Sequence, residues 1–83
     1  MAEWERHSFA YPDGGSYFVK KEQGYTLELI PSTMWIWKIY APHQYWGGYG
    51  EEMRGDAENT REEAEKALYA AFKAILDKRD NET

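Results

Sequence analysis

Cysteine is absent from this 83-residue chain, and histidine occurs only twice. Without thiols the chain can form neither a disulfide framework nor a thiolate metal site, so its stability must come from packing. His7 and His43 lie in different segments and belong to no metal-binding spacing such as H-x-x-x-H or H-x-E. Ser8 follows His7, but adjacency along the chain does not make a catalytic triad. We therefore expect no catalytic residues, no metal, no cofactor and no enzyme activity.

Long apolar runs are also missing. No stretch approaches the ~20 apolar residues that a membrane-spanning helix requires. The first six residues, Met1 to Arg6, lack the basic and then apolar layout of a secretion signal. A soluble, intracellular protein is the expectation.

Basic residues are fewer than acidic ones, 10 against 15, which gives a net charge of −5. The acidity is concentrated in residues 51–65, where seven carboxylates accompany Arg54 and Arg61. Nucleic-acid binders neutralise phosphates with lysine and arginine, so this distribution disfavours that class. It permits a protein partner with a basic surface.

Aromatic residues are abundant, with four Trp, seven Tyr and three Phe. A chain this short forms one domain, residues 1–83, and buries only about 60% of its unfolded surface. Each buried ring removes roughly 150–250 Å² from water, so the rings are the expected material of the core.

Apolar alternation predicts strands at residues 16–21, 25–30 and 34–41, with a weaker one at 51–58. A hairpin turn is expected at 22–24, because Gly24 can adopt positive φ. The strand at 34–41 has bulky residues on both faces and is predicted to be central. In the weak strand, Met53, Gly55 and Ala57 are expected to point inward. Residues 1–15 are either an N-terminal arm or an edge strand, suggested by alternating His7, Phe9 and Tyr11.

A helix is predicted at residues 60–79. Thr60 and Glu63 have the spacing of a capping box, and an apolar stripe recurs at three- and four-residue steps from Ala64 to Ile75. Residues 80–83 are expected to be a frayed tail. The fold class is therefore α+β, a three- to four-stranded antiparallel meander over residues 16–58 with one C-terminal helix packed on one face.

The connection at residues 42–50 combines rings and glycines. Tyr45, Trp46 and Tyr49 stand among three glycines in a connection longer than a usual hairpin loop. One interpretation is a binding loop whose rings anchor a protein partner. The other is a lid that folds over the sheet and covers Ile36 or Tyr40. The two interpretations are compatible.

The acids that follow this loop are the second candidate surface. Glu51, Glu52, Asp56 and Glu58 could form an electrostatic rim that imitates the phosphates of DNA. Alternatively they are the solvated charges that commonly protect an edge strand.

A third candidate is an aromatic platform for single-stranded nucleic acid. Its rings would be Tyr17, Tyr25, Trp35, Trp37 and Tyr40. Few lysines accompany them, and core packing is the favoured interpretation.

A family resemblance adds to this picture. The strand Trp35-Ile36-Trp37, the segment Gly55-Asp56-Ala57 and the helix start from Thr60 to Ala67 resemble the small proteins of bacteriophages and prophages. The resemblance covers residues 24–76 and carries over no functional residue. It implies a phage or prophage origin and a location in the cytoplasm of the bacterial host cell, and anti-CRISPR inhibitors are a prominent class among such proteins.

These observations lead to one functional hypothesis and two alternatives. The hypothesis is a small acidic, non-catalytic protein-binding module that inhibits a host defence complex, such as a CRISPR effector, by occluding its basic nucleic-acid-binding surface. Its partner-binding residues would be Tyr45, Trp46, Tyr49, Glu51, Glu52, Asp56 and Glu58. The alternatives are a nucleic-acid-binding module that uses the aromatic sheet face, and a self-associating structural protein.

Overall fold

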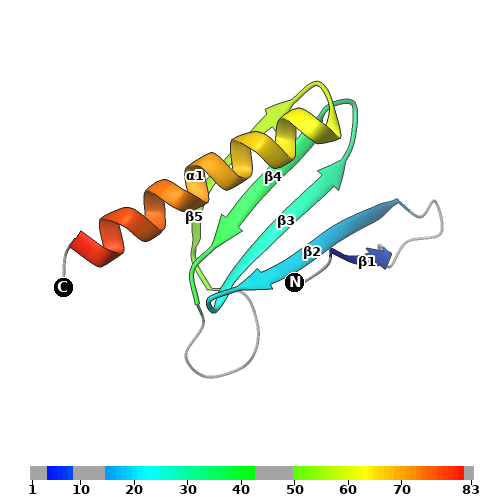
Figure 1. Cartoon of the computed structure of the whole chain (residues 1–83). Helices are drawn as coiled ribbons and strands as arrows, with labels where there is room; N and C mark the ends of the chain where they lie inside the picture. Colours follow the sequence, from blue (N-terminus) through cyan, green and yellow to red (C-terminus); the bar gives the residue numbers. More distant parts are fainter. Residues whose placement is uncertain (1–3, 9–14, 43–49, 82–83) are drawn as a thin grey trace.

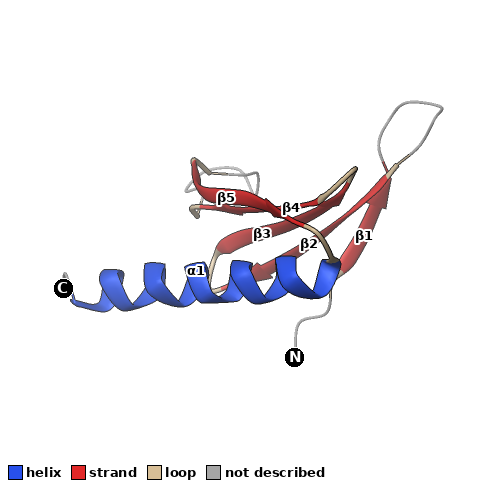
Figure 2. Cartoon of the chain, turned by 90° about the horizontal axis from the view of Figure 1, so that it is seen from above, coloured by secondary structure: helices blue, strands red, loops and turns tan. Residues whose placement is uncertain are grey.

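The computed structural model describes residues 4–8, 15–42 and 50–81. Its elements are β1 (Glu5–Ser8), β2 (Ser16–Glu22), β3 (Tyr25–Pro31), β4 (Trp35–Tyr40), β5 (Glu52–Glu58) and α1 (Arg61–Asn81). The strands form one antiparallel sheet in chain order, β1-β2-β3-β4-β5. The helix crosses one face of this sheet (Figures 1 and 2). The α+β class is confirmed, with one strand more than the upper expected number.

The additional strand is β1, which joins part of the N-terminal segment to the sheet. Its register with β2 runs from Glu5↔Val19 to Ser8↔Ser16. The Arg6 guanidinium donates to the Ser16 hydroxyl at 3.0 Å, which links the two strands through their side chains. Phe9 and Tyr11, which suggested this strand, lie outside the described residues.

The β2–β3 hairpin has the two-residue turn that its glycine predicts. Glu22 pairs with Tyr25, and the residues between them, Gln23 and Gly24, have φ values of 51° and 86°. Positive φ at both central positions is characteristic of a type I′ turn, whose twist matches that of the flanking strands.

The core lies between the helix and the near face of the sheet, which we call the helix face. Its buried residues are Tyr25, Leu27, Leu29, Trp37 and Ile39 from the sheet and Ala64, Leu68, Ala71 and Phe72 from α1. The Tyr25 and Phe72 rings meet edge to face, with centroids 5.4 Å apart. The small alanines allow the helix to approach the sheet closely, and the larger residues fill the remaining space.

The middle of the sheet is β3 rather than β4, so the prediction from the bulky residues of 34–41 was wrong. Five consecutive residues of β3, from Tyr25 to Leu29, are buried. Alternating polar residues are typical of a strand with one solvated face, yet Thr26 is only 1% exposed and Glu28 only 7%. Polar residues therefore occupy buried positions on the other side of the sheet, which we call the far face.

The inward orientation predicted for Gly55 and Ala57 of β5 was also wrong. Gly55 lies opposite Lys38 and Ala57 opposite Ile36, which places both on the far face. Met53, which follows a register shift in the β4–β5 pairing, is 45% exposed and lines a cavity between β5 and the helix. A Cβ on Gly55 would lie only 3.3 Å from Lys38 Cγ, so the small residue accommodates its cross-strand neighbour rather than the helix.

The helix begins as predicted and extends two residues further. The Thr60 hydroxyl accepts from the Glu63 amide at 3.1 Å and donates to the Glu63 carboxylate at 3.0 Å. This arrangement satisfies one of the free amides of the first turn. At the other end, α1 continues through Asn81, so the first part of the expected frayed tail is helical.

Candidate functional site

The predicted acidic rim lies on and beside an edge strand. β5 is the last strand in the sheet, and its residues from Glu52 to Asp56 are all exposed. Glu51, directly before it, is also exposed. Exposed backbone groups at such an edge can pair with an added strand, and charged side chains limit unwanted pairing.

The four acids of the rim do not share one face of the sheet. Glu52 lies opposite Tyr40 on the far face. Asp56 and Glu58 lie opposite Trp37 and Trp35 on the helix face. A partner that contacted all four would therefore have to wrap around the strand edge.

Three of these acids already have contacts within the protein. Glu52 forms an ion pair of 3.3 Å with Lys38, and both side chains are substantially exposed. Asp56 accepts a hydrogen bond of 2.8 Å from the Ala57 amide. Glu58 is half-buried and accepts from the Trp37 indole at 3.3 Å, so it also supports the packing of β4.

Further acids follow at the start of the helix. Glu62 and Glu63 are exposed in the first turn, where negative charge complements the helix dipole. Glu65 pairs with Arg61 at 3.2 Å. The exposed acids of the edge and the helix start are Glu51, Glu52, Asp56, Glu62 and Glu63, and we call this set the acidic margin.

The predicted site also included three rings of the loop before β5. Tyr45, Trp46 and Tyr49 lie outside the described residues. The structure therefore places the acids of the candidate site and not the rings, and both interpretations of the loop stay predictions.

The proposed aromatic platform is divided between the two faces. Tyr25, Trp35 and Trp37 lie on the helix face, whereas Tyr17 and Tyr40 lie on the far face. Because stacked bases need rings on a common surface, these five rings do not make the predicted platform.

The far face contains a polar contact that sequence reasoning missed. The Tyr40 hydroxyl donates to the Glu28 carboxylate at 3.4 Å, and Glu28 lies directly opposite Lys38. Burial raises the pKa of Tyr40 to about 12, and the charges of Glu28 and Glu52 add to this effect. No local sequence signal marks Glu28, because the contact requires the register of β3 and β4.

Among the described residues, no group of three or more His, Cys, Asp or Glu side chains could hold a metal ion. His7 lies on the exposed edge strand β1, where it stacks on Tyr17 and approaches the Glu5 carboxylate at 3.5 Å. His43 lies outside the described residues. In the part of the chain that the structure describes, no helix has the length and apolar character needed to cross a membrane.

Comparison with known proteins finds no matching family model, no matching curated protein and no matching solved structure. The resemblance to small phage proteins therefore stays a prediction.

Proposed function

We propose that this chain is a small acidic, non-catalytic protein-binding module that occludes a basic, nucleic-acid-binding surface of a partner complex. The observation that carries the proposal is the acidic margin, where exposed carboxylates run along an edge strand and into the start of a helix. A surface of this kind is complementary to one that binds phosphates. Inhibition of a CRISPR effector by a phage or prophage protein in the bacterial cytoplasm is the specific form we propose.

Charge is the main contribution that the margin would make to binding. Between Glu51 and Glu65 the seven carboxylates outnumber the two arginines. Of those arginines, Arg61 is paired with Glu65 and directed at the Phe18 ring. Complementary charge of this density mainly raises the association rate, and salt weakens the effect.

The same charges disfavour self-association through β5. A second copy paired through β5 would bring two net negative strands together, because each carries Glu52, Asp56 and Glu58 against Arg54, and like charges across a strand pair are destabilising. A basic partner removes this repulsion. The self-associating alternative would need β1, the other edge strand, which carries Arg6 and His7.

The experiment measures target-DNA binding by a panel of purified CRISPR effector complexes with increasing amounts of this protein. The test variant is Glu51→Gln/Glu52→Gln/Asp56→Asn. A matched control, Glu5→Gln/Asp77→Asn/Asp80→Asn, changes the net charge equally at positions outside the margin. We expect wild type and control to displace DNA from at least one effector and the test variant to require about tenfold more protein.

A third variant, Tyr45→Ala/Trp46→Ala/Tyr49→Ala, tests whether the loop contributes. Folding of each variant is checked first by circular dichroism. Equal inhibition by wild type and the margin variant, or no inhibition of any effector, would overturn the proposal. A gel shift with single-stranded and duplex DNA and RNA, without effector, tests the nucleic-acid-binding alternative.

A further inference from the structure

A cavity of about 550 Å³ lies between the C-terminal half of α1 and strands β3 and β5. Its apolar wall includes Tyr25, Met53 and Ile75. The Tyr25 ring is buried at the sheet, whereas Met53 is largely exposed at the rim. This volume is typical of sites that bind small molecules.

The charged groups around this cavity are all positive. Arg54, Lys78 and Arg79 line it, and no carboxylate does so among the described residues. This is unusual in a chain with a net charge of −5. Within the described residues, neither the Arg54 guanidinium nor the Lys78 ammonium makes a hydrogen bond or an ion pair.

Of the three cations, Arg79 has side-chain contacts within the protein. Its guanidinium donates to the Gln23 side chain at 3.2 Å, lies 3.5 Å from the Asp80 carboxylate and is 5.8 Å from the Tyr25 ring centroid. These contacts join the end of the helix to the β2–β3 turn. They fix the wall of the cavity and leave Arg54 and Lys78 as the available charges.

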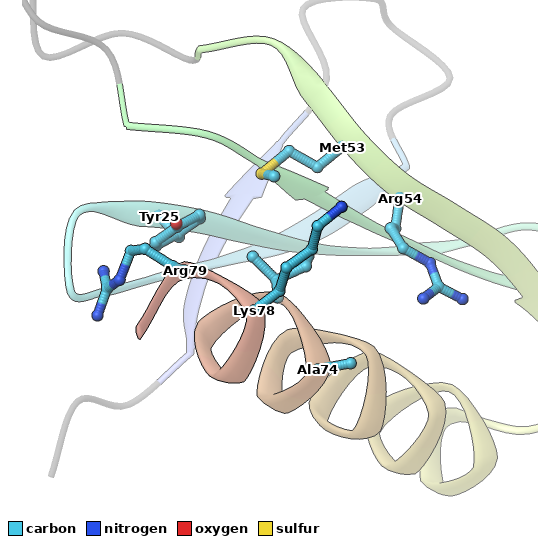
Figure 3. A pocket seen from close by; sticks show the side chains of 7 residues that line it. Tyr25, Met53, Arg54, Ala74, Lys78 and Arg79 are labelled. Carbon is cyan, nitrogen blue, oxygen red and sulfur yellow. The ribbon is translucent and has the colours of Figure 1, made fainter. Parts of the chain in front are cut away.

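The helix dipole explains only part of this arrangement. Lys78 and Arg79 belong to the last turn of α1, where positive charge stabilises the free carbonyls. Arg54 belongs to β5 and has no such role. Figure 3 shows Lys78 reaching from the helix toward β5 and Arg54 reaching from β5 toward the helix. Two elements that are distant in sequence therefore direct unpaired cations at the same cavity.

We propose that this cavity binds a small monocarboxylate with an apolar body. The body would contact Tyr25, Met53 and Ile75, and the carboxylate would lie within reach of Arg54 and Lys78. A neutral ligand would leave the two cations without a partner, and a free cation would be repelled by them. The proposal depends on none of the acids in the acidic margin and is independent of the proposed function.

The test is a titration with octanoate, followed by the methyl NMR signals of Met53 and Ile75. We expect saturable shifts of both signals with octanoate and weaker binding of octanol, which has the same chain and no charge. The variant Arg54→Gln/Lys78→Gln should raise the dissociation constant for octanoate by about tenfold or more.

The matched control is Lys66→Gln/Lys73→Gln, which removes two exposed lysines of the same helix that do not line the cavity. It should bind octanoate like wild type. The proposal is overturned by an absence of saturable shifts or by octanol binding as tightly as octanoate. It is equally overturned if the cavity variant keeps wild-type affinity, or if the control variant loses as much as the cavity variant.

Discussion

On both faces of the sheet, partly buried polar side chains form hydrogen bonds with residues of other elements. On the helix face, the Lys20 ammonium donates to the Tyr69 hydroxyl at 2.6 Å and lies 5.8 Å from the Trp4 ring centroid. The hydrogen bond with Tyr69 is the largest cause that raises the pKa of Lys20. On the far face, Tyr40 and Glu28 form the corresponding contact. Such contacts allow polar residues to occupy positions that water cannot reach freely.

Tyr40 should make the stability of the protein sensitive to alkaline pH. Its pKa is raised to about 12, first by burial and then by the charges of Glu28 and Glu52. An unfolded chain releases a tyrosine proton near pH ~10, so between these values the native state holds a proton that the unfolded state has lost. The contribution of Tyr40 is therefore complete below about pH 10 and decreases as the pH rises toward 12. Denaturant unfolding across this pH range measures the decrease.

The variant Tyr40→Phe isolates this effect, and Tyr17→Phe is its control on the same face. The free energy of unfolding of Tyr40→Phe should fall less steeply with pH than that of wild type, whereas Tyr17→Phe should follow wild type. The raised pKa of Lys20 acts in the same direction in all three proteins and cancels in the comparison. An equal pH dependence for Tyr40→Phe and wild type would contradict the prediction.

The residues that could be predicted from sequence are those whose roles are local. Thr60 and Gly24 act within one turn of chain, and both have the predicted conformations. The roles of Glu28 and Lys20 could not be predicted, because their partners lie on other elements. Tyr69, for example, is 49 residues from Lys20 along the chain. For the candidate site, the exposure of Glu51, Glu52 and Asp56 followed from their setting in a charged edge strand.

Among the elements, the start of α1 is held to the sheet by Arg61. Its guanidinium lies 4.4 Å from the centroid of Phe18 on β2 and 5.9 Å from that of Trp35 on β4. The Glu65 carboxylate, one turn further along the helix, accepts from it at 3.2 Å. Arg61 therefore joins α1 to two strands just after the helix cap.

Replacing Arg61 by methionine should destabilise the protein by about 1–2 kcal/mol, because it removes the cation–π contacts and leaves the aliphatic packing. Lys66→Met is the control, since Lys66 is exposed on the same helix. Urea denaturation of both variants gives the difference in the free energy of unfolding. Indistinguishable values for Arg61→Met and Lys66→Met would show that the cap alone secures this end of the helix.

The elements themselves could largely be predicted, whereas their arrangement could not. Alternation and capping residues gave the approximate spans of four strands and the helix. The position of β3 at the centre and the orientation of β5 depend on strand pairing. A register shift of one residue reverses every side chain of a strand, and the β4–β5 pairing contains such an irregularity at Ile39/Tyr40. The cavity could not be predicted for a similar reason, because Arg54 and Lys78 line the same cavity only after the helix docks on the sheet.

For the molecule as a whole, backbone stability should decrease from the centre of the sheet to its edges. β3 has neighbours on both sides and five consecutive buried residues. β1 is a four-residue edge strand whose residues are all exposed. Native-state hydrogen exchange should therefore find the slowest amides in β3 and the buried part of α1, and amides in β1 that exchange orders of magnitude faster through local opening.

Strand β2 is the control for this prediction. It lies between β1 and β3 in the sheet, so its amides should exchange at intermediate rates. The measurement follows each backbone amide by NMR after transfer to heavy water. Protection in β1 equal to that in β3 would mean that the edge opens only with the whole protein, contrary to this prediction.

The order of the strands has a consequence for how the chain reaches its native state. Because β1 to β5 pair in the order in which they occur, each strand finds its neighbour immediately before it along the chain. Loop closure then involves short segments, and the entropic penalty of bringing distant parts together arises mainly when the helix returns across β3, β4 and β5. A growing chain could thus add one hairpin at a time during synthesis. The final step would be the docking of α1, which buries the apolar residues on the helix face of the assembled sheet.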